Sequence, residues 1–293
     1  MKILERIKSE LSLRIWKAVN KDAFEEDFLR ILPDTLKDAA LFLFSGNSTS
    51  EEKRIAKLIE AYRSQIIATT KDLHSFSSPH SGTFKKDASG RAIAGPYSSS
   101  SAEAHARTGV NIKGGILLKR ITTGVAARRV LELGTNTGFS GCYFLSCPQV
   151  EQLVTIEGSK DLCEIADRNL RRISDKYKIM NMLFDDAIEQ LYRNDEKFDC
   201  VFIDGQHERE ATWHYTTRVM PMLNNGGTII FDDIYWSDDM NRFWKEICMS
   251  LDFSVTIDLR LKGVAILGSG EQSKMLYDIC EYVGRPRIFR KSW

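Results

Sequence analysis

The fold of this chain is decided by the stretch Arg129-Val-Leu-Glu-Leu-Gly-Thr-Asn-Thr-Gly-Phe-Ser140. An apolar run that contains Glu132 ends here, and two glycines, Gly134 and Gly138, bracket a tight polar turn before a helix-like segment. A strand that passes into a helix beside a ligand needs glycine, because a Cβ would block the turn or the approach of the ligand. The stretch therefore predicts a strand, a ligand-binding turn and a helix.

A second apolar run, Leu153-Val-Thr-Ile-Glu157, ends in an acid 23 residues after Gly134 (157 − 134). A carboxylate at this place suits the two hydroxyls of a bound ribose, from which it can accept hydrogen bonds in bidentate fashion. The two runs together indicate a ligand that carries a ribose.

The bulk properties of the 293 residues exclude several classes of protein. The net charge of +1 builds no field for a polyanion, so we expect no nucleic-acid partner. No stretch approaches the roughly 20 apolar residues of a membrane span, and the N-terminus shows no secretory signal. The six cysteines form no CxxC pair. We expect a cytoplasmic protein with reduced cysteines and no membrane partner.

Three parts are predicted along the chain. Residues 1–72 show helical spacing of apolar residues, from Ile3 to Ile15 and again after Ser50. They predict a helical extension that packs on the main domain and offers a possible homodimer surface; alternatively, it takes a direct part in substrate binding. Residues 73–109 are rich in turn formers and form either a lid or a linker. Residues 110–293 make up the main domain.

The main domain alternates between strand-like and helix-like segments. The candidate strands are 129–134, 152–157, 179–184, 198–203 and 227–232, and helix-like segments lie between them. Two more apolar runs, 253–257 and 263–267, are too close together for a helical crossover and should pair antiparallel. We therefore predict an α/β fold with a doubly wound, mostly parallel, seven-stranded Rossmann-like sheet whose last strand is antiparallel.

From about Ile116 to Leu267 the chain resembles the class I S-adenosylmethionine-dependent methyltransferases. The turn from Gly134 to Ser140 is similar to the Gly-x-x-x-Gly-[Tyr/Phe]-Ser loop of the catechol and caffeoyl-CoA O-methyltransferases, with Asn136 where other methyltransferases have a middle glycine. The strings Phe202–Thr212 and Ile230–Met240 are similar to uncharacterised bacterial methyltransferase-like proteins.

The resemblance implies S-adenosylmethionine as the cofactor and assigns its contacts. It places Gly134 and Gly138 at the methionine part, Glu132 at the amino group through the loop, and Glu157 at the ribose. Phe184-Asp-Asp-Ala187 resembles the acid-Ala pair that binds the adenine amino group, so Asp186 is the better candidate of the two acids; alternatively it caps a helix. The further cofactor-binding candidates are Thr135, Ser140 and Asp204.

Two neighbouring predicted strands end in Asp204 and in Asp232-Asp233. The carboxyl ends of parallel neighbours lie side by side, so the three carboxylates should meet and repel one another unless a cation neutralises them. A hard divalent ion such as Mg²⁺ suits oxygen ligands. The separations of 28 (232 − 204) and 29 (233 − 204) resemble the metal ligands of catechol-type and macrolide-sugar O-methyltransferases. Alternatively, Asp233 caps the helix that begins near Ser237, or the site has lost its metal.

His207 lies three residues after Asp204, where those enzymes carry a basic catalytic residue. An imidazole with a pKa near 6.5 can accept the proton of the acceptor hydroxyl at neutral pH. We therefore predict His207 as the general base; the alternative is a structural histidine, as we expect for His214.

The leading hypothesis is a metal-assisted S-adenosylmethionine-dependent O-methyltransferase of a small hydroxylated molecule. The first alternative is a metal-independent N- or carboxyl-methyltransferase whose aspartates bind a cationic substrate. The second is a non-catalytic cofactor-binding or assembly protein. A nicotinamide dehydrogenase fits least well, because neither the glycine loop nor the terminal hairpin suits it.

Overall fold

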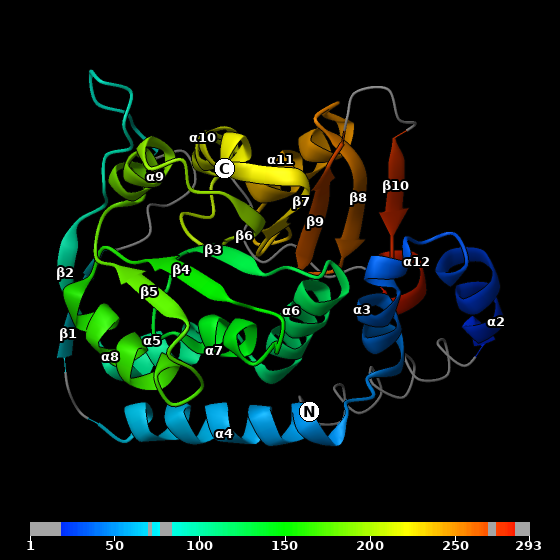
Figure 1. The fold of residues 1–293 in the computed structure, drawn as a ribbon, viewed down its shortest axis with the longest axis horizontal. Helices are drawn as coiled ribbons and strands as arrows, with labels where there is room; N and C mark the ends of the chain where they lie inside the picture. Colours follow the sequence, from blue (N-terminus) through cyan, green and yellow to red (C-terminus); the bar gives the residue numbers. More distant parts are fainter. Residues whose placement is uncertain (1–18, 70–71, 77–83, 269–273, 285–293) are drawn as a thin grey trace, which may run out of the picture.

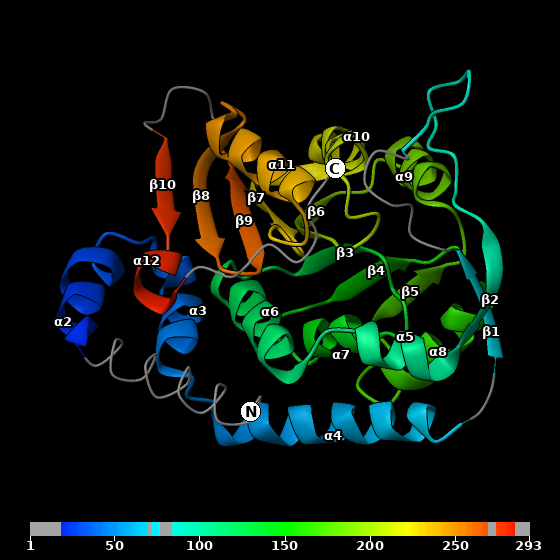
Figure 2. The ribbon, with the colours of Figure 1, turned by 180° about the vertical axis from the view of Figure 1, so that it is seen from behind.

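The computed structural model of the chain describes residues 19–69, 72–76, 84–268 and 274–284. A central sheet carries a layer of helices on each face, and the N-terminal helices lie outside one of these layers (Figures 1 and 2). The helix predicted from Ile3 to Ile15 falls outside the described residues.

The central sheet has eight described strands in the order β10-β8-β9-β7-β6-β3-β4-β5. Their bounds are β3 (Arg129–Leu133), β4 (Gln152–Ile156), β5 (Tyr177–Met180), β6 (Phe198–Ile203), β7 (Leu223–Phe231), β8 (Phe253–Leu259), β9 (Lys262–Leu267) and β10 (Met275–Asp278). Strand β9 lies antiparallel between β7 and β8, and every other pairing is parallel. The predicted mostly parallel sheet with a late antiparallel strand is confirmed.

Two details of the sheet differ from the prediction. The four-residue strand β10 adds an eighth strand beside β8, parallel to it, and is too short to give a clear alternation in the sequence. Strand β5 ends at Met180 rather than at residue 184, because Phe184 already begins the helix α9 (Phe184–Arg193).

Helices cover both faces of the sheet (Figure 1). One face carries α6 (Ile112–Gly124), α7 (Phe139–Leu145) and α8 (Lys160–Leu170), and the other carries α9, α10 (Arg209–Val219), the 3₁₀ turn η2 (Met220–Met222) and α11 (Asp238–Met249). Successive residues of a strand point to opposite faces, so Val130 joins one hydrophobic cluster and Leu131 the other. The central strands are buried on both faces, which explains their nearly continuous apolar runs.

The N-terminal extension consists of α2 (Lys21–Ala23), the π-helix η1 (Phe24–Leu29), α3 (Asp34–Ser45) and α4 (Ser50–Ile67). Helix α4 starts where the sequence predicted, with a capping box: Thr49 Oγ1 accepts from the N–H of Glu52, and the Glu52 carboxylate accepts from the N–H of Thr49. In both views α4 runs along the outside of α5, α6 and α7. The short C-terminal helix α12 (Cys280–Val283) contacts α3.

Arg120 of α6 ties the extension to the main domain. Its guanidinium binds the Glu52 carboxylate in bidentate fashion, at 2.7 and 2.9 Å, and reaches Asp38 of α3 at 3.1 Å. The side chains of Arg120 and Glu52 are only 10% and 6% exposed. The two charges can be buried because they are paired, whereas burying either one without its partner would be strongly destabilising.

Residues 73–109 contain more regular structure than their composition suggests. Strands β1 (Asp72–Phe76) and β2 (Tyr97–Ser101) form an antiparallel pair, and α5 (Ala102–Thr108) follows directly. The pair lies beside α8, where Asp161 accepts a hydrogen bond from the N–H of His74 at 2.8 Å. The segment is thereby anchored next to the carboxyl end of β4.

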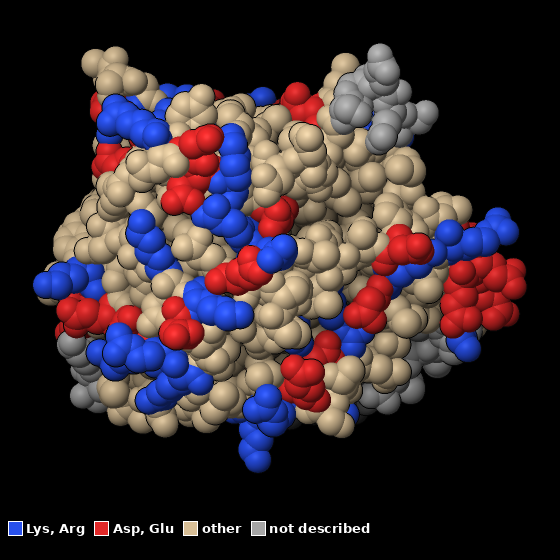
Figure 3. All heavy atoms as spheres, viewed as in Figure 1, with Lys and Arg blue, Asp and Glu red and all other residues tan. Residues whose placement is uncertain are grey.

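The surface in Figure 3 mixes basic and acidic side chains over the face it shows. Among the described helices, none combines the length and the apolar character needed to cross a membrane. All six cysteines are free, and five of them are buried, as the sequence suggested.

Candidate functional site

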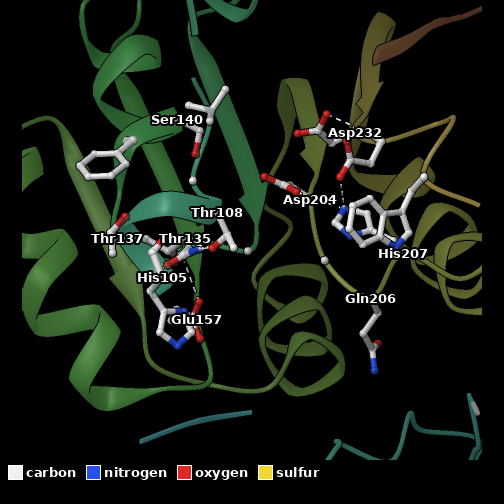
Figure 4. A pocket seen from close by; sticks show the side chains of 18 of the residues that line it. His105, Thr108, Thr135, Thr137, Ser140, Glu157, Asp204, Gln206, His207 and Asp232 are labelled. Carbon is white, nitrogen blue, oxygen red and sulfur yellow. Dashed lines mark hydrogen bonds and ion pairs between the residues drawn. The ribbon is translucent and has the colours of Figure 1, made fainter. Parts of the chain in front are cut away.

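A cavity of about 1500 Å³ opens at the carboxyl ends of β3, β4, β6 and β7. Figure 4 shows that its labelled residues form two groups, one near Glu157 and Thr135, the other around Asp204, His207 and Asp232. Of the predicted site residues, the cavity is lined by Gly134, Thr135, Ser140, Glu157, Asp204, His207, Asp232 and Asp233. Glu132, Gly138 and Asp186 do not line it.

The two glycines of the loop after β3 both have left-handed backbone angles, with φ of 104° at Gly134 and 82° at Gly138. A Cβ at Gly134 would lie 2.1 Å from the carbonyl oxygen of Asp204, and one at Gly138 would lie 3.1 Å from Ala166. Glycine is therefore required by the turn and by the close approach of the neighbouring strand and helix. The predicted need for glycine at the turn has a direct cause in the backbone.

Glu157 is held in the cavity by the loops that follow two strands. Its Oε2 accepts from the N–H of Asn136 at 3.0 Å, and its Oε1 accepts from the N–H of Ser159 at 2.9 Å. Burial raises the pKa of Glu157 above its usual value, although these backbone hydrogen bonds oppose the rise. The orientation of the Glu157 carboxylate, beside the loop after β3, is thus fixed.

Glu132 lies beneath that loop and is fully buried. One carboxylate oxygen accepts from Thr155 Oγ1 at 2.6 Å, and burial raises the pKa of Glu132 to about 8. Within the described part of the chain, three buried atoms around the loop have no hydrogen-bond partner: Glu132 Oε1, Asn136 Oδ1 and Thr137 Oγ1. Buried polar atoms normally have partners, so this loop fits a polar ligand such as the amino acid part of the expected cofactor.

Asp186 lies away from the cavity, with 42% of its side chain exposed and its carboxylate paired with Arg91. The neighbouring Asp185 lines the cavity instead, and it accepts hydrogen bonds from His214 Nε2 at 2.8 Å and from the N–H of Ala92 at 2.5 Å. Successive helical residues point about 100° apart, and on α9 Asp185 faces the cavity while Asp186 does not. The structure thus does not support the predicted contact of Asp186 with the cofactor. His214 is buried and does not line the cavity, and its structural role stays a prediction.

The carboxylates after β6 and β7 meet as predicted, around His207. His207 Nε2 lies 3.2 Å from Asp204 Oδ1 and 4.0 Å from Asp233 Oδ2. Asp233 does not cap the following helix, because the N-cap of α11 is Ser237, whose Oγ accepts from the N–H of Met240. Asp233 therefore faces His207 instead of the helix end.

The electrostatic setting of His207 differs from that of a free imidazole. Burial alone lowers its pKa, but the hydrogen bond to Asp204 and the charges of Asp233, Asp204 and Asp232 outweigh burial and raise the pKa to about 9. At neutral pH most His207 side chains are therefore protonated. The expectation of a pKa near 6.5 does not hold at this site.

Asp232 has a cationic partner that sequence reasoning missed. Lys262 Nζ lies 2.6 Å from Asp232 Oδ1, and the two side chains are only 5% and 12% exposed. The same oxygen accepts from the N–H of Asp233 at 2.8 Å. In the sequence, this pair is indicated only by a lysine at the start of the antiparallel strand, 30 residues after Asp232 (262 − 232).

The three aspartates do not fit a preformed Mg²⁺ site. We looked among the described residues for groups of at least three His, Cys, Asp or Glu side chains whose ligand atoms all lie within 4.8 Å of one another. The group found is Asp258, Asp278 and Cys280, at the far edge of the sheet, and it contains none of the three aspartates of the cavity. At the predicted site, Lys262 contacts Asp232 Oδ1 and His207 contacts Asp204 Oδ1, so two of the three carboxylates already have a basic partner. An ammonium beside Asp232 also repels a divalent cation.

Backbone strain is concentrated around the cavity. Of the six non-glycine residues with positive φ in the described part, four line the cavity: Asn136, Gln206, Asp233 and Arg260. Each such residue costs about 1–3 kcal/mol where its environment forces the conformation, and such residues cluster at functional sites. Three of the four lie in the loops that follow β3, β6 and β7.

Several lining residues come from the segment 73–109 and from its contacts with α4. His105 and Thr108 of α5 line the cavity, and Asn136 Nδ2 lies 3.4 Å from Thr108 Oγ1. Arg63 of α4 donates hydrogen bonds to the carbonyl oxygens of residues 106, 109 and 110, and its guanidinium lies 4.2 Å from the ring centre of Phe139. The extension thereby supports the wall opposite the aspartates.

Comparisons with known proteins agree with the fold. Residues 131–234 match a methyltransferase domain family. A probable caffeoyl-CoA O-methyltransferase of Arabidopsis thaliana is 25% identical over 173 residues, which cover 53% of this chain and 74% of that protein. A catechol O-methyltransferase of Mycobacterium tuberculosis is 29% identical over 147 residues, covering 49% and 64%.

Among solved structures, an SAH-bound methyltransferase of Podospora anserina shares the fold with a TM-score of 0.53. The sequence identity is 13%, and the match covers 82% of this chain and 98% of that one. The likeness extends beyond the matched domain family and includes most of the described chain.

Proposed function

Since residues 131–234 form a methyltransferase domain of the class I, S-adenosylmethionine-dependent kind, we propose that this enzyme methylates a hydroxyl oxygen of a small molecule. The observation that carries the proposal is the division of one cavity into two parts (Figure 4): a ribose-type carboxylate and unpartnered loop atoms on one side, and a histidine among carboxylates on the other. The two relatives, both named as O-methyltransferases, support oxygen as the acceptor atom.

The residues of the chain divide the work of the reaction. Bound S-adenosylmethionine supplies the methyl group from its sulfonium. Glu157 accepts hydrogen bonds from the ribose hydroxyls, and Glu132 supports, from beneath, the loop that would hold the amino acid part of the cofactor. His207, in its neutral form, accepts the proton of the acceptor hydroxyl. The cavity walls hold donor and acceptor in line and exclude water, which is a large part of the catalysis of a displacement.

The segment 73–109 forms part of the cavity wall through residues such as Phe76, Ser98 and His105. We therefore take it as a lid on the Glu157 side of the cavity rather than as a linker. Residues at this wall would cover the bound cofactor and exclude water from it.

Glu157→Ala is expected to weaken the binding of S-adenosylmethionine by tenfold or more. The variant removes the acceptor of the ribose hydrogen bonds, each worth about 1.5–3 kcal/mol when the acceptor is charged. Isothermal titration calorimetry at neutral pH measures the affinity directly. The matched control is Glu151→Ala, since Glu151 precedes β4 at the opposite end and has a 53% exposed side chain. Equal affinity of the two variants would contradict the role of Glu157.

The reaction itself is tested by a screen with cofactor labelled in the methyl group. A library of small phenols, sugars and hydroxy acids should yield at least one labelled product whose new methyl group is on oxygen. Binding of the cofactor without transfer to any acceptor would favour a non-catalytic cofactor-binding protein. Transfer of the methyl group to nitrogen or to a carboxylate would favour the metal-independent N- or carboxyl-methyltransferase.

A further inference from the structure

Lys262 occupies a position that the register of the sheet fixes. Strand β9 runs antiparallel to β7, and Gly263 pairs with Phe231. The next pair outward therefore sets Lys262 opposite Asp232, at the same rim as Asp204 and His207. On its other side β9 pairs with β8, and the pairing of Leu259 with Lys262 in this hairpin also fixes the position of Lys262.

The ammonium group of Lys262 is buried and lies at the cavity. Besides Asp232, it faces the ring of Phe202, whose centre lies 5.1 Å away, and Lys262 itself lines the cavity. An ammonium has three N–H donors, and within the described residues one hydrogen bond of Lys262 is found, to Asp232 Oδ1. Donors remain for a ligand at the rim.

The negative charge of the rim is partly compensated by basic side chains of the chain itself. Lys262 contacts Asp232, and His207 contacts Asp204 and lies within 4.0 Å of Asp233, so each of the three carboxylates has a basic partner. A divalent cation that took Asp232 Oδ1 as a ligand would displace the Lys262 ammonium, which lies 2.6 Å from that oxygen in a pair whose side chains are only 5% and 12% exposed. The attraction between the Lys262 ammonium and the Asp232 carboxylate is far stronger in this buried pair than it would be in water.

We propose that Lys262 replaces a divalent cation in this enzyme: its ammonium holds the acceptor oxygen and makes turnover independent of metal. The inference rests on the proposed function and specifies its chemistry. The acceptor O–H bond breaks with its proton passing to the neutral imidazole of His207. The oxygen's electron pair forms the bond to the methyl carbon, and the electron pair of the broken C–S bond stays on sulfur. Lys262 keeps its protons throughout and donates hydrogen bonds to the oxygen as negative charge develops.

The first test needs no variant. The melting temperature of the wild type is measured with S-adenosylhomocysteine present, with MgCl₂, MnCl₂ or EDTA added. We expect the three conditions to give the same melting temperature, because an ion that does not bind the native state cannot stabilise it. Stabilisation by Mg²⁺ or Mn²⁺ that is lost in Asp204→Asn would overturn the proposal.

The second test moves the site toward a metal site. Lys262→Met keeps the length of the side chain and frees the Asp232 carboxylate, so this variant should gain stabilisation by Mn²⁺ that the wild type lacks. Its turnover of an acceptor from the screen should fall by about 10²–10³, the usual loss for one donor to a developing oxyanion. The control is Lys197→Met, which removes a lysine from the opposite end of β6. Wild-type turnover in Lys262→Met, without added metal, would overturn the proposal.

Lys262→Met leaves a buried carboxylate unpaired and could fail to fold. The double variant Lys262→Met/Asp232→Asn removes both charges; it should fold, bind cofactor with wild-type affinity, lose turnover and show no response to Mn²⁺. Retained turnover in the double variant would contradict the role of Lys262. Cofactor affinity distinguishes a failure of the proposed function from a failure of the inference about Lys262. If the wild type binds no S-adenosylmethionine, the proposed function is refuted. If it binds S-adenosylmethionine and needs Mg²⁺ for turnover, only the inference about Lys262 is refuted.

Discussion

Arg120→Met is expected to lower the free energy of unfolding by about 3–5 kcal/mol, the usual cost of removing one partner of a buried ion pair. The substitution leaves the 6% exposed carboxylate of Glu52 without its bidentate partner, and it removes the contact with Asp38. Chemical denaturation at neutral pH measures the loss. Arg171→Met is the matched control, since its ion pair with Asp167 on α8 involves a 71% exposed arginine and should contribute less than about 1 kcal/mol.

The pH dependence of this loss identifies its cause. Burial raises the pKa of Glu52, but the hydrogen bonds from Arg120 and Thr49 outweigh burial and hold it below the ordinary value of 4.5. A carboxyl group with a lowered pKa stabilises the fold above its unfolded pKa and loses that contribution as the pH falls through its folded pKa. The difference between wild type and Arg120→Met should therefore shrink below pH 4.5. Arg120→Met/Glu52→Gln should recover part of the stability, and a loss that stays constant with pH would point to packing alone.

His207→Gln is expected to lower turnover by about 10²–10⁴ while cofactor affinity stays nearly unchanged. The variant keeps a polar side chain of similar size but cannot accept the proton. His74→Gln serves as the control, because His74 has a 60% exposed side chain on β1 and does not line the cavity. Both variants are assayed with an acceptor from the screen at saturating cofactor. Turnover of His207→Gln close to that of His74→Gln would return His207 to a structural role.

The pH profile of turnover carries the sharper information. The pKa of His207 is about 9, so at pH 7 only about 1% of the imidazole is neutral and able to accept a proton. Wild-type turnover should rise about tenfold per pH unit from pH 7 and level off near pH 9, and the rise should be absent in His207→Gln. A profile that levels off near pH 6.5 would mean that the three aspartates are neutralised by something other than His207, as a bound divalent cation would do.

Sequence reasoning was most successful where a short pattern has a single physical outcome. The glycine loop from Gly134 to Gly138, the runs that become β3, β4, β6 and β7, and the close pair that becomes β8 and β9 were all identified from local residues. Parallel strands put their carboxyl ends at one rim, so the meeting of Asp204, Asp232 and Asp233 also followed from the order of the elements.

Side-chain direction on a helix could not be obtained in this way. Asp185 and Asp186 are adjacent, and the pattern favoured the second. The phase of α9 turns Asp185 toward the cavity and Asp186 toward Arg91. That phase is set by the packing of Ala187, Ile188 and Leu191 against the sheet, which requires the tertiary structure.

By itself the sequence determined the α/β fold, the rim at which the site lies and the acidic residues that gather there. It did not determine the charge balance of that rim. Lys262 reaches Asp232 only because an antiparallel strand is inserted beside β7 in one particular register, and three carboxylates converge on His207 only after β6 and β7 are paired. Electrostatic interactions depend on distance and burial, and both are set by the folded chain rather than by spacing along it.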